Sequence, residues 1–399
     1  MHVVHLTWEY PPVVYGGLGR HVHALSIAQA AAGHRVTVVT QQTPEAAESE
    51  TKDGVQVRRV PPSGPFPYHL PSLLTWVGLL DHRIRRAAAT VADVDVVHAH
   101  DWVVGRAGAG TADRHGVPLV STVHATEAGR HSGWLPDDVS RAVHLIEQWL
   151  VDESDSLIVC SRAMADEVVR AHAADAATIT VIPNGIDVAD YARCERIPAE
   201  LLVGSPRITF VGRLEWEKGV FTAVEALPAV LARHPRTQLR IVGTGGQSEA
   251  VRAAVEAAGL TGGVRLLGHV DEATLRAVYT SSDVAVVPSS YEPFGLVALE
   301  AAAMGVPLIV GDTGGLAEFV TDERGRRCRP GDPQDLAARI LEVLSDTALT
   351  HQRRDAARAA LTDYSWPSIA ERTLLVYEQA TRTRRPARRT RAPGNPIGV

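Results

Sequence analysis

The sequence predicts an α/β protein made of two successive doubly wound domains, and two observations lead to this expectation. The chain has 399 residues with 45% hydrophobic content, which is more than one compact core of ordinary size holds. Short apolar runs typical of buried strands also alternate with helical patterns, and this alternation begins afresh after residue 206. We therefore expect one domain over residues 1–188 and a second over 207–365.

The pattern changes between and beyond these domains. Residues 189–206 contain prolines and a glycine without a clean period, as expected of an interdomain linker. A helical pattern over 366–381 closes the fold, and we expect this helix to pack back toward the first domain. The last segment, 382–399, is rich in Arg and Pro and is predicted to be a disordered tail.

Composition argues against several classes of partner and site. A net charge of -6 argues against a nucleic-acid-binding surface, and no apolar run approaches the roughly 18 residues of a membrane span. The amino end runs straight into a strand without a basic or cleavage region, so we expect no secretion signal and a cytoplasmic protein. Cys160, Cys194 and Cys328 show no paired spacing, which favours neither a disulfide framework nor a zinc site.

In the first domain each expected strand is a short apolar run bounded by Gly, Pro or polar residues. Strands are expected at His2–Leu6, Arg35–Thr40, Val55–Val60, Val94–His100, Pro118–Val123, Leu157–Cys160 and from Val181. Helical periodicity is expected at Arg20–Ala32, Leu73–Ala92, Asp137–Val151 and Arg162–His172. This is the βαβ order of a doubly wound domain.

In the second domain the same order repeats, with glycines in the loops after several strands. Strands are expected at Arg207–Gly212, Leu239–Val242, Val264–Leu267, Val284–Val287 and Pro307–Val310. Helices are expected at Val220–His234, at Leu296–Met304, from Gly314 and at Pro367–Ala380. The repeat supports a second doubly wound domain.

The stretch Ser289–Glu300 joins a strand to a helix and carries two glutamates eight positions apart. Pro293 restricts the turn into the helix, and Gly295 lets a ligand approach the backbone. The first N–H groups of the helix would stabilise a phosphate. Glu292 at the rim and Glu300 further inside are suited to binding hydroxyl groups at two depths. The alternative is an ordinary strand–turn–helix unit with two solvated acids.

Two other features favour a ligand at strand ends. Gly16-Gly17-Leu18-Gly19 would let phosphate or sugar approach the backbone; it lacks the G-x-G-x-x-G order of a dinucleotide fingerprint, and a tight turn is the alternative. Only Lys52 and Lys218 are lysines among 40 basic residues. Because an ammonium and a guanidinium are not interchangeable at a phosphate, Lys218 is a candidate phosphate ligand, with chance placement as the alternative.

Polar residues also follow strands of the first domain. His98, His100 and Asp101 suggest a metal, but 98 and 100 share one strand face while 101 is the first loop position, so we expect His100 and Asp101 to line a cleft. His124 begins a polar loop, with a core histidine bonded to a backbone carbonyl as the alternative. Asp93-Val94-Asp95 resembles a D-x-D metal motif but precedes its strand, which favours turn chemistry.

Three motifs occur together and in order: Pro183-Asn184-Gly185-Ile186-Asp187, Gly212-Arg213 with Lys218-Gly219, and Glu292-Pro-Phe-Gly-Leu ending at Glu300. Their joint occurrence resembles the retaining glycosyltransferases of family four, and the similarity spans nearly the whole chain except its arginine-rich tail. The resemblance implies the GT-B fold, two Rossmann-like domains facing a central cleft, with the acceptor on the side of the first domain and the nucleotide sugar in the second.

Motifs of the first domain indicate a branch of that family. Gly16–Gly19, His98–Trp102 and Thr122–His124 are similar to glycogen synthases. Trp8–Pro12 and His124–Arg130 look more like the actinobacterial α-1,4-glucosyltransferases of methylglucose polysaccharide synthesis. The resemblance therefore implies a glucosyltransferase that acts in polysaccharide synthesis.

The resemblance also implies roles for the candidate residues. Arg213 and Lys218 would neutralise the donor pyrophosphate, Glu300 would bind the ribose hydroxyls and Glu292 a hydroxyl of the transferred sugar. The main-chain carbonyl of His124 would face the anomeric carbon, and its imidazole would bind a primary hydroxyl. Other donor-binding candidates are Gly16, Gly17, Asn184, Phe294, Gly295 and Leu296. The acceptor-side candidates are Glu9, Asp101, Glu127 and Arg130.

The expected reaction transfers glucose from UDP- or ADP-glucose to an α-1,4-glucan or methylglucose-type oligosaccharide. Attack on the same face as the leaving phosphate requires no carboxylate nucleophile, and we expect neither a cofactor nor a metal. Starch and bacterial glycogen synthases carry a lysine two positions before the paired glycines, where this chain has Val14-Tyr15, so the donor base stays open.

Three different activities also fit this resemblance. They are a maltose 1-phosphate synthase, a transferase to a lipid or small-molecule acceptor, and an isomerase resembling nucleotide-sugar 2-epimerases. The expected partners are a nucleotide-sugar donor and an oligosaccharide acceptor, with no nucleic acid. The oligomeric state is open, with a homodimer as one option.

Overall fold

The structure of the protein is a computed structural model. It describes residues 1–12, 14, 16–44, 46–64, 70–191, 194 and 196–383. Tyr15, residues 192, 193 and 195 of the expected linker and residues 384–399 of the expected tail lie outside this description. No described helix is long and apolar enough to cross a membrane.

The chain divides into two compact units of α/β architecture. Unit 1 comprises Met1–Val159, Ala165–Ile182 and the chain from Ile369 onward, and unit 2 comprises Cys160–Met164 and Pro183–Ser368. These bounds differ from the expected 1–188, 189–206 and 207–365. The described part of 189–206 belongs to unit 2, because Leu201 is buried against Val242 and Val278.

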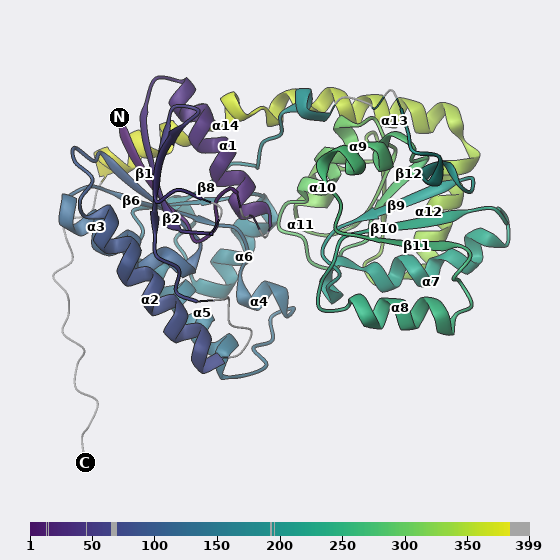
Figure 1. The fold of residues 1–399 in the computed structure, drawn as a ribbon, viewed down its shortest axis with the longest axis horizontal. Helices are drawn as coiled ribbons and strands as arrows, with labels where there is room; N and C mark the ends of the chain where they lie inside the picture. Colours follow the sequence, from purple (N-terminus) through teal and green to yellow (C-terminus); the bar gives the residue numbers. More distant parts are fainter. Residues whose placement is uncertain are drawn as a thin grey trace, which may run out of the picture. The chain divides into compact units, whose positions relative to one another are not determined.

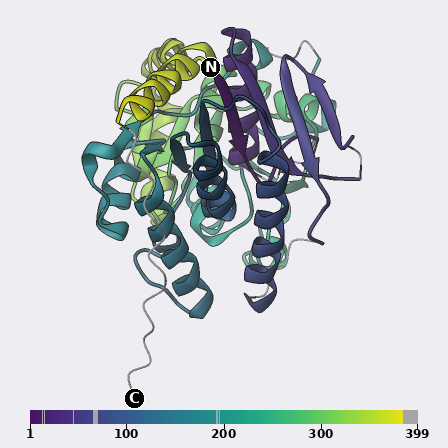
Figure 2. The same cartoon turned by 90° about the vertical axis from the view of Figure 1, so that its left-hand side faces the viewer.

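Unit 1 contains one sheet of eight strands in the described residues, with the order β3-β4-β2-β1-β5-β6-β7-β8. All neighbours are parallel except β3 and β4, which form an antiparallel pair, visible at the right of Figure 2. The strands are β1 (His2–Leu6), β2 (Arg35–Gln41), β3 (Ser49–Lys52), β4 (Val55–Val60), β5 (Val96–His100), β6 (Leu119–Val123), β7 (Ser156–Val159) and β8 (Ile179–Val181). Sequence patterning missed β3, which is short and polar.

The helices associated mainly with unit 1 are α1 (Gly17–Ala31), α2 (Leu70–Ala88), α3 (Gly105–His115), α4 (Glu127–Arg130), α5 (Asp138–Glu153), α6 (Arg162–His172) and α14 (Trp366–Thr383), with short 3₁₀ turns η1 (Trp102–Val104) and η2 (Ala176–Thr178). Although α14 is the last helix, its residues from Ile369 belong to unit 1, and it is the yellow helix in Figures 1 and 2.

Several expected bounds in unit 1 differ from those of the structure, and two of the differences have a local reason. Helix α1 begins at Gly17 rather than Arg20, because the Glu9 carboxylate accepts hydrogen bonds from the backbone N–H groups of Gly16 and Gly19. Strand β5 begins at Val96 rather than at residue 94, because the Asp95 carboxylate accepts the N–H of His2 at 2.6 Å. Asp93 lies in a bend with φ 52°, as expected of turn chemistry, whereas the carboxylate of Asp95 bonds to a residue of another strand.

Unit 2 contains a parallel sheet of six described strands in the order β11-β10-β9-β12-β13-β14. The strands are β9 (Arg207–Val211), β10 (Gln238–Val242), β11 (Val264–Gly268), β12 (Val284–Val287), β13 (Leu308–Gly311) and β14 (Arg326–Cys328). The predicted doubly wound α/β class is confirmed for both units, whereas β14 was not predicted.

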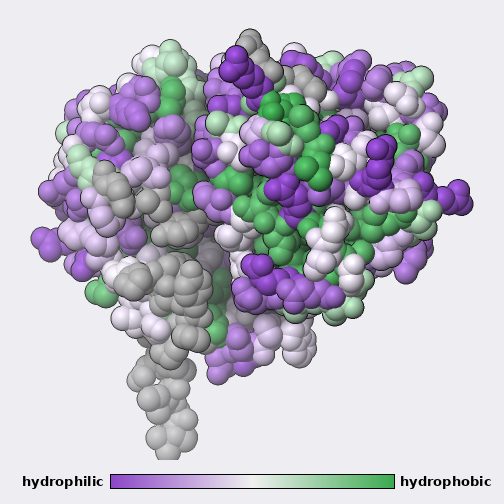
Figure 3. Space-filling view, turned by 45° about the vertical axis from the view of Figure 1, so that its right-hand side comes forward, coloured by the Kyte–Doolittle hydropathy of each residue, from purple (hydrophilic) through white to green (hydrophobic). Residues whose placement is uncertain are grey.

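Helices cover both faces of the unit 2 sheet, with α7 and α8 on one side and α9 and α10 on the other (Figure 1). The helices are α7 (Val220–Leu231), α8 (Ser248–Ala257), α9 (Glu272–Thr280), α10 (Leu296–Ala303), α11 (Gly314–Phe319), α12 (Pro333–Ser345) and α13 (Thr347–Ala359), with 3₁₀ turns η3 (Val188–Tyr191), η4 (Ala199–Leu202), η5 (Trp216–Lys218) and η6 (Ala360–Tyr364). Hydrophobic residues, green in Figure 3, interrupt a largely hydrophilic surface on the face shown.

A buried arginine on a central strand links three parts of unit 2. The Arg240 side chain is fully buried and donates to the Leu201 carbonyl, the Val278 carbonyl and the hydroxyls of Thr209, Ser281 and Ser282, at 2.6–3.1 Å. Burial lowers the pKa of this guanidinium to about 10, so it remains charged at neutral pH. The two terminal nitrogens of this planar group carry four N–H donors, and they make all of these contacts.

We predict that Arg240→Lys destabilises the protein by about 3 kcal/mol, because an ammonium has three donors and leaves buried oxygens without partners. The urea midpoint of unfolding, followed by circular dichroism, measures the effect. Arg236→Lys, at an exposed position before the same strand, is the control, with an expected change within about 0.5 kcal/mol. Equal midpoints for the two variants would contradict the role of Arg240.

Unit 1 buries an acid beside a histidine. The Glu147 carboxylate on α5 accepts the Glu127 N–H at 2.9 and 3.1 Å and lies 3.4 Å from Nε2 of His172 on α6. Burial raises the pKa of Glu147 to about 8 and lowers that of His172. Both groups are therefore neutral near pH 7 in the folded protein.

The raised pKa of Glu147 predicts a pH-dependent contribution to stability. Between its unfolded value of 4.5 and about 8, the folded state keeps a proton that the unfolded state releases. The contribution is therefore present at low pH and is lost as pH rises toward 8, by up to about 1.4 kcal/mol per pH unit. Glu147→Gln should remove this slope, so variant minus wild-type stability should rise from pH 5 to pH 8. Thermal unfolding of both proteins between pH 5 and pH 8 measures this difference, and a difference that does not change with pH would contradict the role of Glu147.

Candidate functional site

Loops at the carboxyl ends of the unit 2 strands approach one another closely through glycines. A Cβ on Gly219, after β9, would lie 2.0 Å from the Pro288 carbonyl oxygen, and one on Gly314, after β13, would lie 2.0 Å from the Glu292 carbonyl oxygen. Both glycines also have positive φ, 74° and 50°. Only glycine fits these positions, so the loops after β9, β12 and β13 meet at one edge of the sheet.

Lys218 and Glu292 form an ion pair at this edge. Their Nζ and Oε2 atoms are 2.9 Å apart, and each side chain is 17% exposed. The 3₁₀ turn η5 presents Lys218, and the Glu217 carbonyl accepts the Ser290 N–H at 2.8 Å, which joins the loop of the lysine to that of the acid. The pair is therefore held by backbone contacts on both sides.

Arg213 lies in the same loop as Lys218 and is more open to solvent. Its guanidinium is 3.2 Å from Oε1 of Glu217, and its side chain is 48% exposed. The loop thus presents two cations, one already paired with Glu292 and one at the surface. Glu217 was not among the predicted site residues, and only its spacing of four residues from Arg213 could have indicated the contact.

The start of helix α10 follows Glu292 directly. Gly295 is its N-cap with φ 99°, a value that L side chains rarely adopt, and the helix begins at Leu296 after the buried Phe294. Its first N–H groups carry the positive end of the helix dipole. The structure therefore places Phe294, Gly295 and Leu296 at a helix N-terminus, as predicted, beside Glu292 in the sequence.

Glu300 lies one turn further along α10 and is almost completely buried, with 4% exposed. The Tyr191 hydroxyl, on the 3₁₀ turn η3, donates to its Oε1 at 3.3 Å. Tyr191 was not predicted as a site residue, because it lies in the stretch assigned to a linker and 109 residues from its partner. The Glu300 carboxylate is thus oriented by a phenol from another part of unit 2.

The Pro183–Asp187 motif forms a turn in unit 2. Asn184 is buried, and a Cβ on Gly185 would lie 2.6 Å from the Trp366 ring. The Ile186 N–H donates to the Tyr364 carbonyl at 2.7 Å. The turn is therefore set by contact with the segment that leads into α14.

In unit 1, predicted acidic residues support the glycine loop and the histidine loop. Glu9 is 4% exposed and holds the backbone at Gly16, next to Gly17 at the start of α1. The Asp101 carboxylate accepts the His124 N–H at 2.7 Å. Burial raises the pKa of Asp101 to about 7 and lowers that of His124 to about 3, so the His124 imidazole is neutral at pH 7.

The segment after His124, expected to be a loop, contains the short helix α4. Thr126 caps this helix by accepting the Gly129 N–H, and the Glu127 carboxylate accepts the Ser140 hydroxyl at 2.7 Å. Arg130, at the end of α4, is exposed. Glu9, Asp101 and Glu127 therefore have partners inside unit 1, and their acceptor-side role and that of Arg130 stay predictions.

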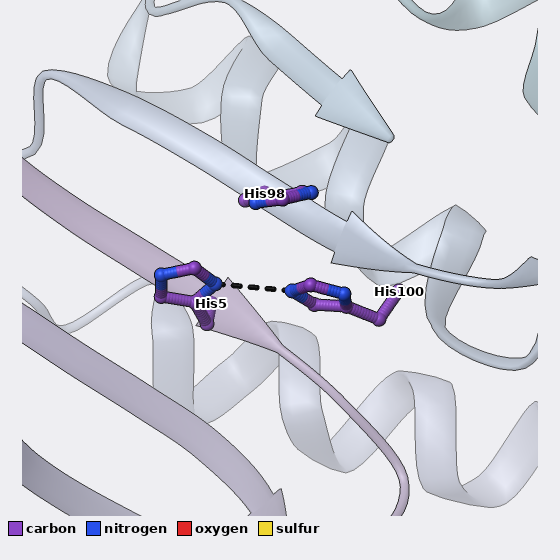
Figure 4. A group of neighbouring side chains, drawn as sticks. All are labelled: His5, His98 and His100. Carbon is purple, nitrogen blue, oxygen red and sulfur yellow. Dashed lines mark hydrogen bonds between the residues drawn. The ribbon is translucent and has the colours of Figure 1, made fainter. Parts of the chain in front are cut away.

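Behind His124 lies a cluster of buried histidines from β1 and β5. Figure 4 shows that the rings of His5, His98 and His100 lie together, with Nδ1 of His5 3.0 Å from Nε2 of His100. Nδ1 of His100 is in turn 3.3 Å from Nε2 of His124. His100 has no exposed surface, so the expectation that its side chain lines a cleft is wrong; it contacts His124 from the interior.

Comparison with known proteins assigns the family. Residues 195–360 match the family described as "Glycosyl transferases group 1" and residues 15–190 the one described as "Glycosyltransferase Family 4". The chain is 43% identical to a glycogen synthase of Mycobacterium tuberculosis, over 96% of each chain. It is 34% identical to a D-inositol 3-phosphate glycosyltransferase of Xylanimonas cellulosilytica, over 94% of each.

A solved structure agrees with these matches. The sucrose-phosphate synthase of Thermosynechococcus elongatus superposes with a TM-score of 0.81 at 25% identity, over 95% of this chain and 98% of that one. Both the fold and the sequence therefore lead to one assignment. The chain belongs to the group 1 glycosyltransferases and has the GT-B fold.

Proposed function

We propose that the protein is a retaining glucosyltransferase that moves glucose from UDP- or ADP-glucose to an α-1,4-glucan or a methylglucose-type oligosaccharide. The observation that carries the proposal is the Lys218–Glu292 pair beside the start of α10. It combines a cation and helix N–H groups for phosphate with a carboxylate for sugar hydroxyls. The identity of 43% with a glycogen synthase supports glucose transfer to a glucan.

In this proposal the donor pyrophosphate is bound by Lys218, Arg213 and the first N–H groups of α10. Without a donor, Lys218 is balanced by Glu292 at 2.9 Å. A bound pyrophosphate would become the second anion beside Lys218 and leave Glu292 able to accept hydrogen bonds from sugar hydroxyls. Positive charge fixed in place stabilises the leaving diphosphate most in the transition state, where its negative charge grows.

The ribose is assigned to Glu300, and a hydroxyl of the transferred sugar to Glu292. Two carboxylate oxygens can accept hydrogen bonds from both ribose hydroxyls, and Tyr191 would keep that carboxylate oriented. Asn184, Gly16 and Gly17 complete the proposed donor set. His124 would present its carbonyl to the anomeric carbon, and the bond from its N–H to Asp101 supports that backbone orientation.

The acceptor hydroxyl would attack from the face that the diphosphate leaves, and a phosphate oxygen would take its proton. The new glycosidic bond forms as the bond from the anomeric carbon to phosphate breaks, so configuration is retained. No step in this scheme uses a carboxylate nucleophile, in contrast to retaining glycosidases with paired acids. No cofactor or metal is assigned a role.

A second candidate keeps the donor and changes the acceptor to a small phosphorylated molecule. The identity of 34% with a D-inositol 3-phosphate glycosyltransferase favours it over a lipid acceptor and over epimerisation of the donor. Glucose 1-phosphate, which would make a maltose 1-phosphate synthase, belongs to the same chemical class of acceptor. Exposed Arg130 at the end of α4 is a cation that such an acceptor could contact.

The test is a donor and acceptor screen that detects released nucleoside diphosphate. UDP-glucose and ADP-glucose are each incubated with maltooligosaccharides, with glucose 1-phosphate, with inositol phosphate or alone, and products are identified by mass spectrometry. Extension of maltooligosaccharides with retained α configuration is the expected result. Sugar epimerisation without release of diphosphate would replace this proposal with an isomerase.

We predict that Lys218→Ala lowers kcat by a factor on the order of hundreds, as for loss of one preorganised charge that stabilises the transition state. Lys218→Arg should recover little, because a planar guanidinium does not fit the position of the ammonium beside Glu292. The control is Lys52→Ala, at the other lysine of the chain, which is exposed on β3. Turnover of Lys218→Ala close to that of Lys52→Ala would rule out the assignment to pyrophosphate.

We predict that Glu300→Gln acts mainly on donor binding and raises KM for the nucleotide sugar about tenfold, because an amide offers one acceptor where the carboxylate offers two. Tyr191→Phe should raise KM less, since it removes the hydrogen bond that orients Glu300 and leaves the carboxylate in place. Steady-state kinetics at saturating acceptor separate KM from kcat. A large fall in kcat with unchanged KM for Glu300→Gln would place this residue at the reacting atoms instead.

A further inference from the structure

We propose that a buried chain of hydrogen bonds from Tyr377 through Gln29, His5 and His100 determines which ring nitrogen of His124 carries its proton. Tyr377 and Gln29 are then positioning residues that act through His124. The proposal rests on the proposed function for its effect on catalysis, because His124 is assigned there to the transferred sugar. The state of the chain itself can be tested without substrate.

The contacts form a continuous path through the core of unit 1. The Gln29 amide nitrogen, on α1, is 3.1 Å from the hydroxyl of Tyr377 on α14, and its carbonyl oxygen is 2.7 Å from Nε2 of His5. Nδ1 of His5 is 3.0 Å from Nε2 of His100, and Nδ1 of His100 is 3.3 Å from Nε2 of His124. Gln29, His5 and His100 therefore each form their two bonds on the path through two different side-chain atoms.

A side branch of the path ends at Thr122. The Tyr377 hydroxyl is 2.6 Å from Nδ1 of His98, and Nε2 of His98 is 2.7 Å from the Thr122 hydroxyl. Hydrogen bonds within unit 1 therefore occupy both ring nitrogens of His5, His98 and His100. The three rings lie close enough to hold a metal ion, but their nitrogens are satisfied without one.

The histidines of the path are neutral, which limits each ring to one proton. Burial lowers the pKa of His5 to about 4 and of His124 to about 3, and it lowers the pKa values of His98 and His100 well below the ordinary range. The neighbouring rings add to this effect on His98 and His100, because two imidazolium charges in contact would repel. Each neutral ring is one donor and one acceptor.

Because each neutral ring has one donor and one acceptor, the orientation of the Gln29 amide determines which nitrogen of each ring on the path is protonated. Its NH₂ group donates to Tyr377 and its oxygen accepts from Nε2–H of His5, so Nδ1 of His5 is an acceptor. His100 must then donate from Nε2–H to His5 and accept at Nδ1. His124 must in turn donate from Nε2–H to His100.

The consequence concerns the side of His124 that a ligand meets. Its Nε2–H is used toward the interior, so Nδ1 carries a lone pair and can accept a hydrogen bond from a substrate hydroxyl. Reversing the Gln29 amide would reverse every bond on the path and convert Nδ1 of His124 into a donor. The chain therefore couples a residue of α14 to the hydrogen-bonding character of His124.

The tautomer is measured by NMR on the full chain with ¹⁵N-labelled histidine. Two-bond proton–nitrogen correlations distinguish a ring protonated at Nε2 from one protonated at Nδ1, and His124→Gln identifies the resonances of His124. The expected result at pH 7 is a single Nε2–H tautomer for His5, His100 and His124. A protonated Nδ1 on His124 or a charged ring in the path would overturn the proposal.

The coupling is measured with Tyr377→Phe, which removes the hydroxyl that accepts from Gln29. Without that acceptor the amide can take either orientation, and His124 should populate both tautomers. If the two tautomers of His124 become equally populated, kcat/KM for the nucleotide sugar should fall twofold. If the tautomer equilibrium shifts by the free energy of one hydrogen bond, about 1.4 kcal/mol, kcat/KM should fall tenfold. Tyr279→Phe, at another fully buried tyrosine, is the control.

A second variant keeps the test decisive if Tyr377→Phe fails to fold. Gln29→Met preserves the size of the side chain and removes both of its hydrogen bonds on the path. An unchanged single tautomer of His124 in a folded Tyr377→Phe or Gln29→Met protein would refute the coupling. If the wild-type protein transfers no glucose, the proposed function is rejected. The NMR result then still tests the proposal about the chain of hydrogen bonds.

Discussion

The parallel arrangement of strands is the constraint on which the candidate site of unit 2 depends. All six described strands of this sheet are paired in parallel, so their carboxyl ends lie at one edge and the loops that follow them meet there. Lys218 follows β9 and Glu292 follows β12, 74 residues apart, yet their side chains are 2.9 Å apart. Glycines at the crossing points allow the loop backbones to touch.

A common feature of this edge is that charged groups already have partners inside unit 2. Lys218 contacts Glu292, Arg213 contacts Glu217, and Glu300 accepts from Tyr191. In the proposed function a donor would exchange these partners for phosphate and hydroxyl groups. Binding would therefore not begin with isolated charges, and the side chains would already be oriented when the donor arrives.

Buried polar groups organise the interiors of both units in different ways. In unit 2 a charged guanidinium, Arg240, is matched by five neutral acceptors. In unit 1 the buried groups are neutral rings, an amide and a phenol, which accept and donate in a directional chain. The second arrangement carries no net charge, and it lets the orientation of one amide influence a residue at the end of the chain.

The local sequence pattern predicted several strands and one helix with the bounds that the structure has. The bounds of β1, β4, β12 and helix α6 agree with those expected, since short apolar runs and amphipathic periods are properties of neighbouring residues. It missed α3, a helix with three glycines. This helix lies close to the sheet, because a Cβ on Gly108 would be 2.9 Å from that of Ala99. Tertiary packing overrode low helix propensity there.

By itself the sequence determined the α/β class and the repeated strand–helix order, and it proposed Lys218, Glu292 and Glu300 as candidate residues, because these depend on local pattern and motif. Only the tertiary structure decided which of them touch. The contact of Tyr191 with Glu300, and of Tyr377 with His98 across 279 residues, depends on the path of the chain and on strand register. Neither leaves a local signal in the sequence.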